Sequence, residues 1–136
     1  TAGEQYSYMS MWSLMAAPLF YSGDMGRLDE FTLNVLCNAE VIDVNQDPLG
    51  KQARIVRRSE DELVLAKPLE DGSLAVGLFN LSEGERTVAA SWTELGVKGG
   101  RRARDLWRQK DLGAQPDGYS AKIERHGVSF VRLAAK

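Results

Sequence analysis

The chain has 136 residues and a formal net charge of −2, with 43% hydrophobic and 26% charged residues. This length allows one ordinary domain, and the composition is that of a globular protein. Charges of both signs are interspersed and no apolar run reaches the roughly 18 residues of a transmembrane helix, so we expect neither nucleic acid nor a membrane as a partner. One cysteine and one histidine are too few for an internal disulfide or a structural zinc site, and we expect no metal and no cofactor.

Residues 3–17 are predicted to form a helix. Apolar side chains recur there at the spacing i, i+3, i+4 and i+7, which places them on one stripe of the helix, namely Tyr8, Met11, Trp12 and Met15. We interpret these aromatic and methionine side chains as packing residues rather than as a cofactor site. Pro18 ends the predicted helix.

A short apolar run, Leu19-Phe20-Tyr21, follows and is predicted to be a buried parallel strand. Asp29 is a good N-cap for a second helix, and Asn38 is predicted to cap a further short one. One strand between helices cannot form a sheet by itself, because parallel strands need neighbours. The first third of the chain therefore reads as the end of a larger α/β structure.

The stretch from Asn45 to Gly50 separates two kinds of pattern. Asp47 precedes a proline, which disfavours helix, and Gly50 permits a positive φ, so a helix is predicted to end here. After it, short apolar runs alternate with turn residues, which predicts about seven or eight strands of an antiparallel sandwich. The predicted strands include residues 55–56, 63–66, 74–79, 87–90, 103–107, 119–123 and 128–133, with a single helical turn after Ser91.

The candidate site is the polar group that directly follows the predicted strand, namely Tyr21, Ser22, Gly23 and Asp24. In α/β barrels the loops after the strands build the active site, so these residues are placed to border a substrate pocket. The alternative is that Asp24 orders the loop before the second helix. No catalytic triad is predicted, because the single histidine, His126, lies in a predicted turn. Charged residues near the fifth predicted strand are interpreted as a solvated sheet face, namely Asp105, Asp111, Arg101, Arg102 and Arg104.

Three stretches of the sequence resemble one known family. They are Met11–Leu19 (MWSLMAAPL), Glu40–Gly50 (EVIDVNQDPLG), and Arg104–Trp107 followed by Asp111–Gly113. Their order and spacing are similar to those in the C-terminal part of the α-galactosidase and α-N-acetylgalactosaminidase group, glycoside hydrolase family 27. Lys67-Pro68-Leu69 and His126-Gly127-Val128 also fit this family, so the resemblance covers nearly the whole chain.

The resemblance implies a (β/α)8 barrel followed by an antiparallel β domain. Residues 1–50 would be the last helix–strand–helix of the barrel, and residues 51–136 a Greek-key-like β-sandwich. Enzymes of this family are retaining, with one aspartate that attacks the sugar and another that donates and later accepts a proton. Both aspartates are implied to lie upstream of Thr1. We therefore assign no catalytic residue, and we expect the whole protein to hydrolyse terminal α-galactosides but this chain alone to be inactive.

A stand-alone carbohydrate-binding or structural sandwich module is the alternative hypothesis. Trp92 and Trp107 are its candidate sugar-stacking residues, and core packing is the competing interpretation of both. The sequence does not decide between galactose and N-acetylgalactosamine.

The helical part is expected to carry an apolar face that lacks its barrel neighbours. Self-association would bury this face, which comprises Tyr8, Met11, Trp12, Phe31 and Val35. The sequence leaves the compartment unknown, since any signal peptide would lie upstream of Thr1, as in a periplasmic or secreted protein.

Overall fold

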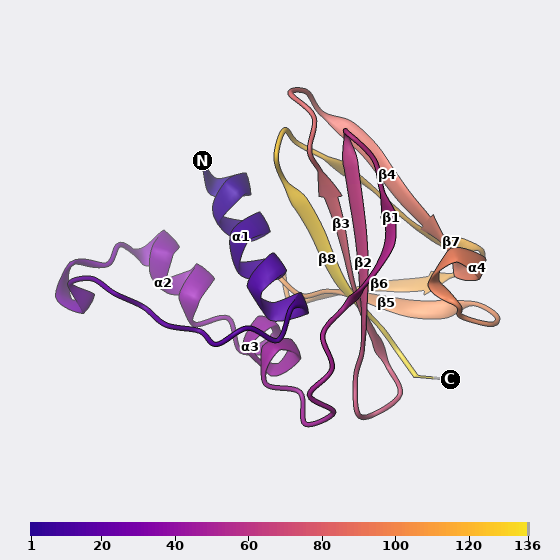
Figure 1. The fold of residues 1–136 in the computed structure, drawn as a ribbon, viewed down its shortest axis with the longest axis horizontal. Helices are drawn as coiled ribbons and strands as arrows, with labels where there is room; N and C mark the ends of the chain where they lie inside the picture. Colours follow the sequence, from indigo (N-terminus) through magenta and orange to yellow (C-terminus); the bar gives the residue numbers. More distant parts are fainter. Residues whose placement is uncertain (136) are drawn as a thin grey trace.

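The computed structural model describes residues 1–135 and has three layers (Figure 1). Helices cover one face of a six-stranded sheet, and a two-stranded sheet covers the other face. The helical elements are α1 (Ala2–Leu14), the 3-10 turn η1 (Met25–Arg27), α2 (Glu30–Leu36), α3 (Ala39–Asn45) and the short α4 (Trp92–Leu95). The strands are β1 (Arg54–Arg58), β2 (Glu62–Pro68), β3 (Leu74–Asn80), β4 (Arg86–Ser91), β5 (Arg101–Asp105), β6 (Lys110–Gln115), β7 (Gly118–Ile123) and β8 (Val128–Leu133).

The predicted helix starts and stops are confirmed where a side chain supplies a cap. Asp29 accepts a hydrogen bond from the Thr32 amide at 2.7 Å and starts α2, and Asn38 caps α3 in the same way. The last helix before the sheets ends at Asn45, and Gly50 adopts a φ of 64°, as its glycine identity indicated. Within the described residues no helix is long and apolar enough to cross a membrane.

The prediction of a strand at Leu19–Tyr21 is wrong for this chain. The segment forms no strand in the structure, and Phe20 is 91% exposed. A strand is stabilised by the hydrogen bonds and side-chain contacts of its neighbours, and no other strand of residues 1–135 lies beside this segment. The segment instead runs as an extended connection between α1 and η1 (Figure 1).

The antiparallel sandwich is confirmed, with the strand order β1-β2-β3-β8-β5-β6 in the large sheet and β4-β7 in the small one. Central strand β3 pairs with β2 from Asn80↔Glu62 to Leu74↔Pro68, without a register shift. Successive side chains of a strand point to opposite faces, so β3 contributes to two cores. Val76 and Leu78 face the small sheet, whereas Ala75 and Phe79 face the helices.

The strand β6 was not predicted, and the strand expected over residues 103–107 is shorter than predicted. Strand β5 ends at Asp105, because Leu106 and Trp107 turn toward the helices. The Trp107 indole donates a hydrogen bond to Ser10 Oγ of α1 at 2.9 Å. This turn leads directly into β6, which pairs with β5 at the sheet edge.

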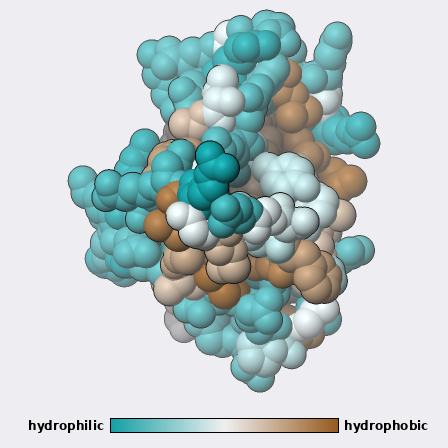
Figure 2. Space-filling view, turned by 90° about the vertical axis from the view of Figure 1, so that its left-hand side faces the viewer, coloured by the Kyte–Doolittle hydropathy of each residue, from teal (hydrophilic) through white to brown (hydrophobic). Residues whose placement is uncertain are grey.

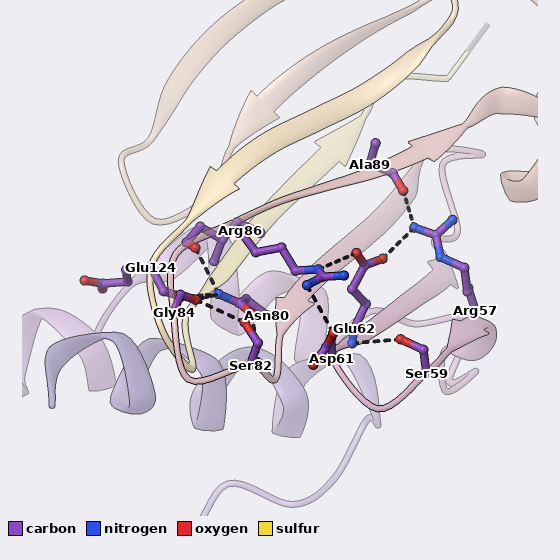
Figure 3. A network of polar contacts seen from close by, with 11 residues as sticks. Arg57, Ser59, Asp61, Glu62, Asn80, Ser82, Gly84, Arg86, Ala89 and Glu124 are labelled. Atoms are coloured by element: carbon purple, nitrogen blue, oxygen red, sulfur yellow. Dashed lines mark hydrogen bonds and ion pairs between the residues drawn. The ribbon is translucent and has the colours of Figure 1, made fainter.

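Polar side chains join the two sheets at one end of the sandwich (Figure 3). Glu62 of β2 accepts hydrogen bonds from Arg57 of β1 at 3.1 Å and from Arg86 of β4 at 2.8 Å. Arg57 also donates to the backbone oxygen of Ala89 in β4. The guanidinium groups, Arg86 first, lower the pKa of Glu62. The network fixes β4 against the β1–β2 edge of the large sheet.

A buried lysine joins the helices to the sandwich. Lys67 of β2 is 0% exposed, and its Nζ donates to the backbone oxygen of Val44 at 2.5 Å and to that of Ser13 at 3.4 Å. Val44 lies in the last turn of α3, and four residues further on stands Pro48, which has no N–H to continue the helix ladder. Lys67 thus supplies the donor that the proline lacks, and burial lowers its pKa.

Candidate functional site

A large apolar groove lies on the helical side of the molecule. Its volume is about 980 Å³, and it is lined by α1, the connection after it, α2 and the second half of α3. Tyr8, Phe20 and Met25 line it and are 63%, 91% and 73% exposed. Figure 2 looks onto this side and shows hydrophobic residues reaching the surface. Exposed apolar side chains gathered in this way mark a surface that a further segment or partner covers.

Of the four predicted site residues, Tyr21 alone lines this groove, and the four do not form one cluster. Tyr21 lines the groove and is 45% exposed, and its hydroxyl lies so close to Gly23 that a Cβ there would meet it at 2.6 Å. Asp24 points back into its own loop, where Oδ1 accepts a hydrogen bond from the Gly26 amide at 3.0 Å. Ser22 is exposed and does not line the groove. The pocket-border role of these residues stays a prediction.

The groove offers no pair of carboxyl groups. Among its lining residues Glu4 carries the one carboxyl group. Retaining glycoside hydrolysis needs two carboxyl groups about 5 Å apart. The described residues also contain no cluster of three or more His, Cys, Asp or Glu that could hold a metal ion.

The two candidate stacking residues are far apart in the fold and differ in burial. Trp92 belongs to the core between the sheets, is 5% exposed, and donates its indole N–H to the Pro116 oxygen at 2.8 Å. Trp107 is half-buried against the middle of α1, with its ring centroid 4.7 Å from that of Tyr6. Trp107 is therefore the better placed of the two to meet a ligand. Sugar stacking stays a prediction for both.

A second, more polar groove of about 500 Å³ opens between β7, β8 and the turn after β5. Asp105, Tyr119 and Ser129 line it. The interpretation of Asp105 as part of a solvated face is wrong, because the residue is 4% exposed. The sequence held a usable signal: residues two apart on a strand share a face, and the inward-facing Ala103 places Asp105 on the same side.

The shape of the fold is shared with glycoside hydrolases. A family GH27 β-L-arabinopyranosidase from Geobacillus stearothermophilus superposes with a TM-score of 0.94 and is 34% identical, over 98% of this chain and 30% of that one. The α-galactosidase I of Mortierella vinacea has the same TM-score at 23% identity, over 100% of this chain and 36% of that one, which shows the fold alone. Both are larger proteins of which this chain matches one part.

The sequence comparisons define the family. Residues 60–133 match the family described as the alpha galactosidase C-terminal beta sandwich domain, and residues 1–47 match the family described as alpha galactosidase A. The chain therefore belongs to the α-galactosidase family, glycoside hydrolase family 27.

Curated relatives are much longer than this chain. The alpha-galactosidase of Cyamopsis tetragonoloba is 41% identical over 100% of this chain, which spans 34% of that protein. The probable alpha-galactosidase of Dictyostelium discoideum is 36% identical over 96% of the chain and 35% of its own length. The chain thus spans about a third of the curated relatives that it matches.

Proposed function

We propose that this chain is the C-terminal part of a retaining α-galactosidase-like glycoside hydrolase. Residues 1–50 then end a (β/α)8 barrel, and residues 51–136 form the β-sandwich that follows it. The family matches over residues 1–47 and 60–133 support this division, as does the change from helices to strands between Asn45 and Arg54.

The observation that carries the proposal is the apolar groove. Its walls include Phe20, which lies in an extended segment without a strand partner and is almost fully exposed. A neighbouring strand would satisfy the backbone of this segment, and neighbouring helices would bury Tyr8 and Met25. About two-thirds of each relative's length lies outside the matched part, which is enough chain to supply these neighbours.

In the proposed enzyme this chain supports the active site without performing the chemistry. The nucleophile and the acid/base would come from the remainder of the barrel, because the groove contains no second carboxyl beside Glu4. The loop Tyr21–Asp24 would border the sugar pocket, as the loops after barrel strands do. Packing of the sandwich on α1 and α3 would hold that loop in place.

Hydrolysis assays on two forms of the protein test the proposal. One form is the 136-residue chain, and the other is the whole protein encoded in its source. Both are assayed with 4-nitrophenyl α-galactoside, α-N-acetylgalactosaminide and β-L-arabinopyranoside. We expect hydrolysis of the α-galactoside by the whole protein and none by the chain. Turnover by the chain itself, or a whole protein that cleaves none of the three, would contradict the proposal.

A further inference from the structure

The smaller groove lies where strands β5 and β8, which pair over a short stretch, separate from each other. Strand β5 pairs with β8 over Ala103–Asp105 alone, opposite Leu133–Val131. The Leu106 amide still donates to the Phe130 oxygen at 3.0 Å, and the chain then turns away. The β8 residues Val128 and Ser129 therefore have a strand neighbour on their β3 side and none on their β5 side. Strand β7 of the small sheet faces this opening, and the space of about 500 Å³ lies between them.

The floor of the groove carries a buried carboxyl group, that of Asp105, which is 4% exposed. Asp105 Oδ1 accepts a hydrogen bond from the Arg108 amide at 2.9 Å, and Oδ2 accepts one from the Arg108 guanidinium at 2.8 Å. The Arg108 side chain is 79% exposed, so water weakens its attraction for the buried carboxylate. A buried carboxylate with a solvent-screened partner adds little to stability. Each oxygen also keeps a free lone pair for a hydroxyl donor.

Two hydroxyl groups line the same groove as this carboxyl group. Tyr119 Oη and Ser129 Oγ lie 2.9 Å apart, across the space between β7 and β8. Burial raises the pKa of Tyr119, which keeps its phenol neutral and able to donate. One hydroxyl donates to the other, so the pair retains one free hydrogen and several acceptor lone pairs. The groove therefore presents donors and acceptors together.

The charges around the groove almost cancel, which favours a neutral ligand. Lys122 and Glu85 pair with each other at 2.6 Å on the rim, and Arg108 pairs with Asp105 on the floor. Glu124 is the remaining charged residue of the lining. A strongly charged ligand would have to compete with these pairs, whereas a hydroxyl group can donate to a carboxylate and accept from a guanidinium without separating them.

Aromatic rings complete the lining. Tyr6 of α1 and Trp107, in the turn after β5, contribute rings to one wall, and both residues are half-buried. A ligand with both an apolar face and several hydroxyl groups matches a wall of rings over a floor of polar atoms. The volume lies within the roughly 300–1,000 Å³ of small-molecule sites.

We propose that this groove, defined by Asp105, Trp107, Arg108, Tyr119 and Ser129, is a binding site for a neutral sugar. It is separate from the apolar groove and needs no residue outside this chain. The choice of a galactoside as the first probe rests on the proposed function.

Nuclear magnetic resonance of the ¹⁵N-labelled chain tests the site. Methyl α-galactoside is titrated into the protein, and D-glucose is titrated separately. We expect saturable shifts in the millimolar range at the Trp107 indole and at the amides of Arg108 and Ser129. Shifts with either sugar support a neutral-sugar site, and the ratio of the two affinities gives its selectivity. The absence of saturable shifts at these groups with both sugars would overturn the proposal.

Matched variants assign the binding to the groove. Tyr119→Phe retains the ring and removes the hydroxyl, and we expect it to weaken binding about fivefold to tenfold. Arg102→Gln removes an exposed ion pair with Asp111 on β5 and β6, outside the groove, and is expected to leave the affinity unchanged. Equal affinities of the two variants would refute the assignment. Because binding is read on a chain that is expected not to hydrolyse anything, failure here and failure of the proposed hydrolase function are separate results.

Discussion

Replacement of the buried Lys67 by methionine tests how the helices are held against the sandwich. Lys67→Met keeps an unbranched side chain of similar length and removes the ammonium group. In the structure that group donates to the Val44 oxygen at 2.5 Å and to the Ser13 oxygen at 3.4 Å. Pro48 cannot replace it as a donor to Val44, so the variant leaves a buried carbonyl without a partner.

Two opposing terms set the magnitude. A buried acceptor left unsatisfied costs about 1–3 kcal/mol, and the contact of a cation with the C-terminal ends of two helices adds about 0.3–1 kcal/mol each. Against this, methionine removes the desolvation cost of the ammonium, which is the cause that lowers the pKa of Lys67. We expect the carbonyl to dominate, with a net loss of about 1–2 kcal/mol in the free energy of unfolding at pH 7.

The pH dependence of the free energy of unfolding separates the desolvation of the ammonium from the loss of its hydrogen bonds. Because the pKa of Lys67 is lower in the folded state than in the unfolded state, the unfolded chain binds more protons between the two values. The lysine therefore makes the folded state more stable as the pH rises from the folded pKa toward about 10.4, the unfolded value. The methionine variant lacks this contribution, so the difference in stability between wild type and variant grows over that window.

Urea unfolding followed by tryptophan fluorescence, at several pH values from neutral to alkaline, measures both effects. Lys110→Met, at an exposed position of β6, is the control and is expected to change the free energy of unfolding by less than about 0.5 kcal/mol. A Lys67→Met chain as stable as wild type at pH 7 would show that desolvation outweighs the carbonyl contact. A difference that shrinks with rising pH would refute the assigned sign.

Three further outcomes are expected. The chain alone should self-associate through the apolar groove, and Phe20→Ser should shift the mass measured by light scattering toward the monomer; a concentration-independent monomer in the wild type would contradict this. Glu62→Gln should lower the free energy of unfolding by about 1 kcal/mol. Because the pKa of Glu62 is lowered in the folded state, the stabilisation by its carboxylate is present above the unfolded pKa of about 4.3 and is lost as the pH falls through the folded pKa. Equal acid-unfolding curves for wild type and variant would rule this stabilisation out. Asn38→Ala should cost about 1–3 kcal/mol, because Asn38 caps α3 and also donates to the Leu106 oxygen at 3.0 Å; a Tm within error of wild type would refute this.

Local rules account for the parts of the fold that the sequence predicted correctly. Asp29 and Asn38 act as caps within three residues of their own backbone partners, so their roles are written into short stretches of sequence. The strands of the sandwich have apolar runs because both faces of the large sheet are buried, one under helices and one under β4 and β7. The resemblance to glycoside hydrolase family 27 added that the helical part ends a barrel and that the sandwich follows it.

The missed elements depend on neighbours or on irregular pairing. Strand β6 contains Gly113 at a φ of 77°, and its register with β5 shifts between Ala103 and Arg104, so its sequence lacks the alternation of a regular strand. The segment around Phe20 has the apolar character of a strand but no partner in residues 1–135. Asp105 is buried because the chain reverses direction just after it, and that turn brings Arg108 to its side.

We propose that this chain ends a hydrolase whose catalytic carboxyl groups lie in a preceding part. The most direct measurement is the intact mass of the protein purified from its source, recorded beside that of the 136-residue chain. Because the chain spans 34% of its relative from Cyamopsis tetragonoloba, we expect a native mass about three times that of the chain. A native mass equal to that of the chain would contradict it and would leave a free-standing module, whose function would then have to be sought in binding.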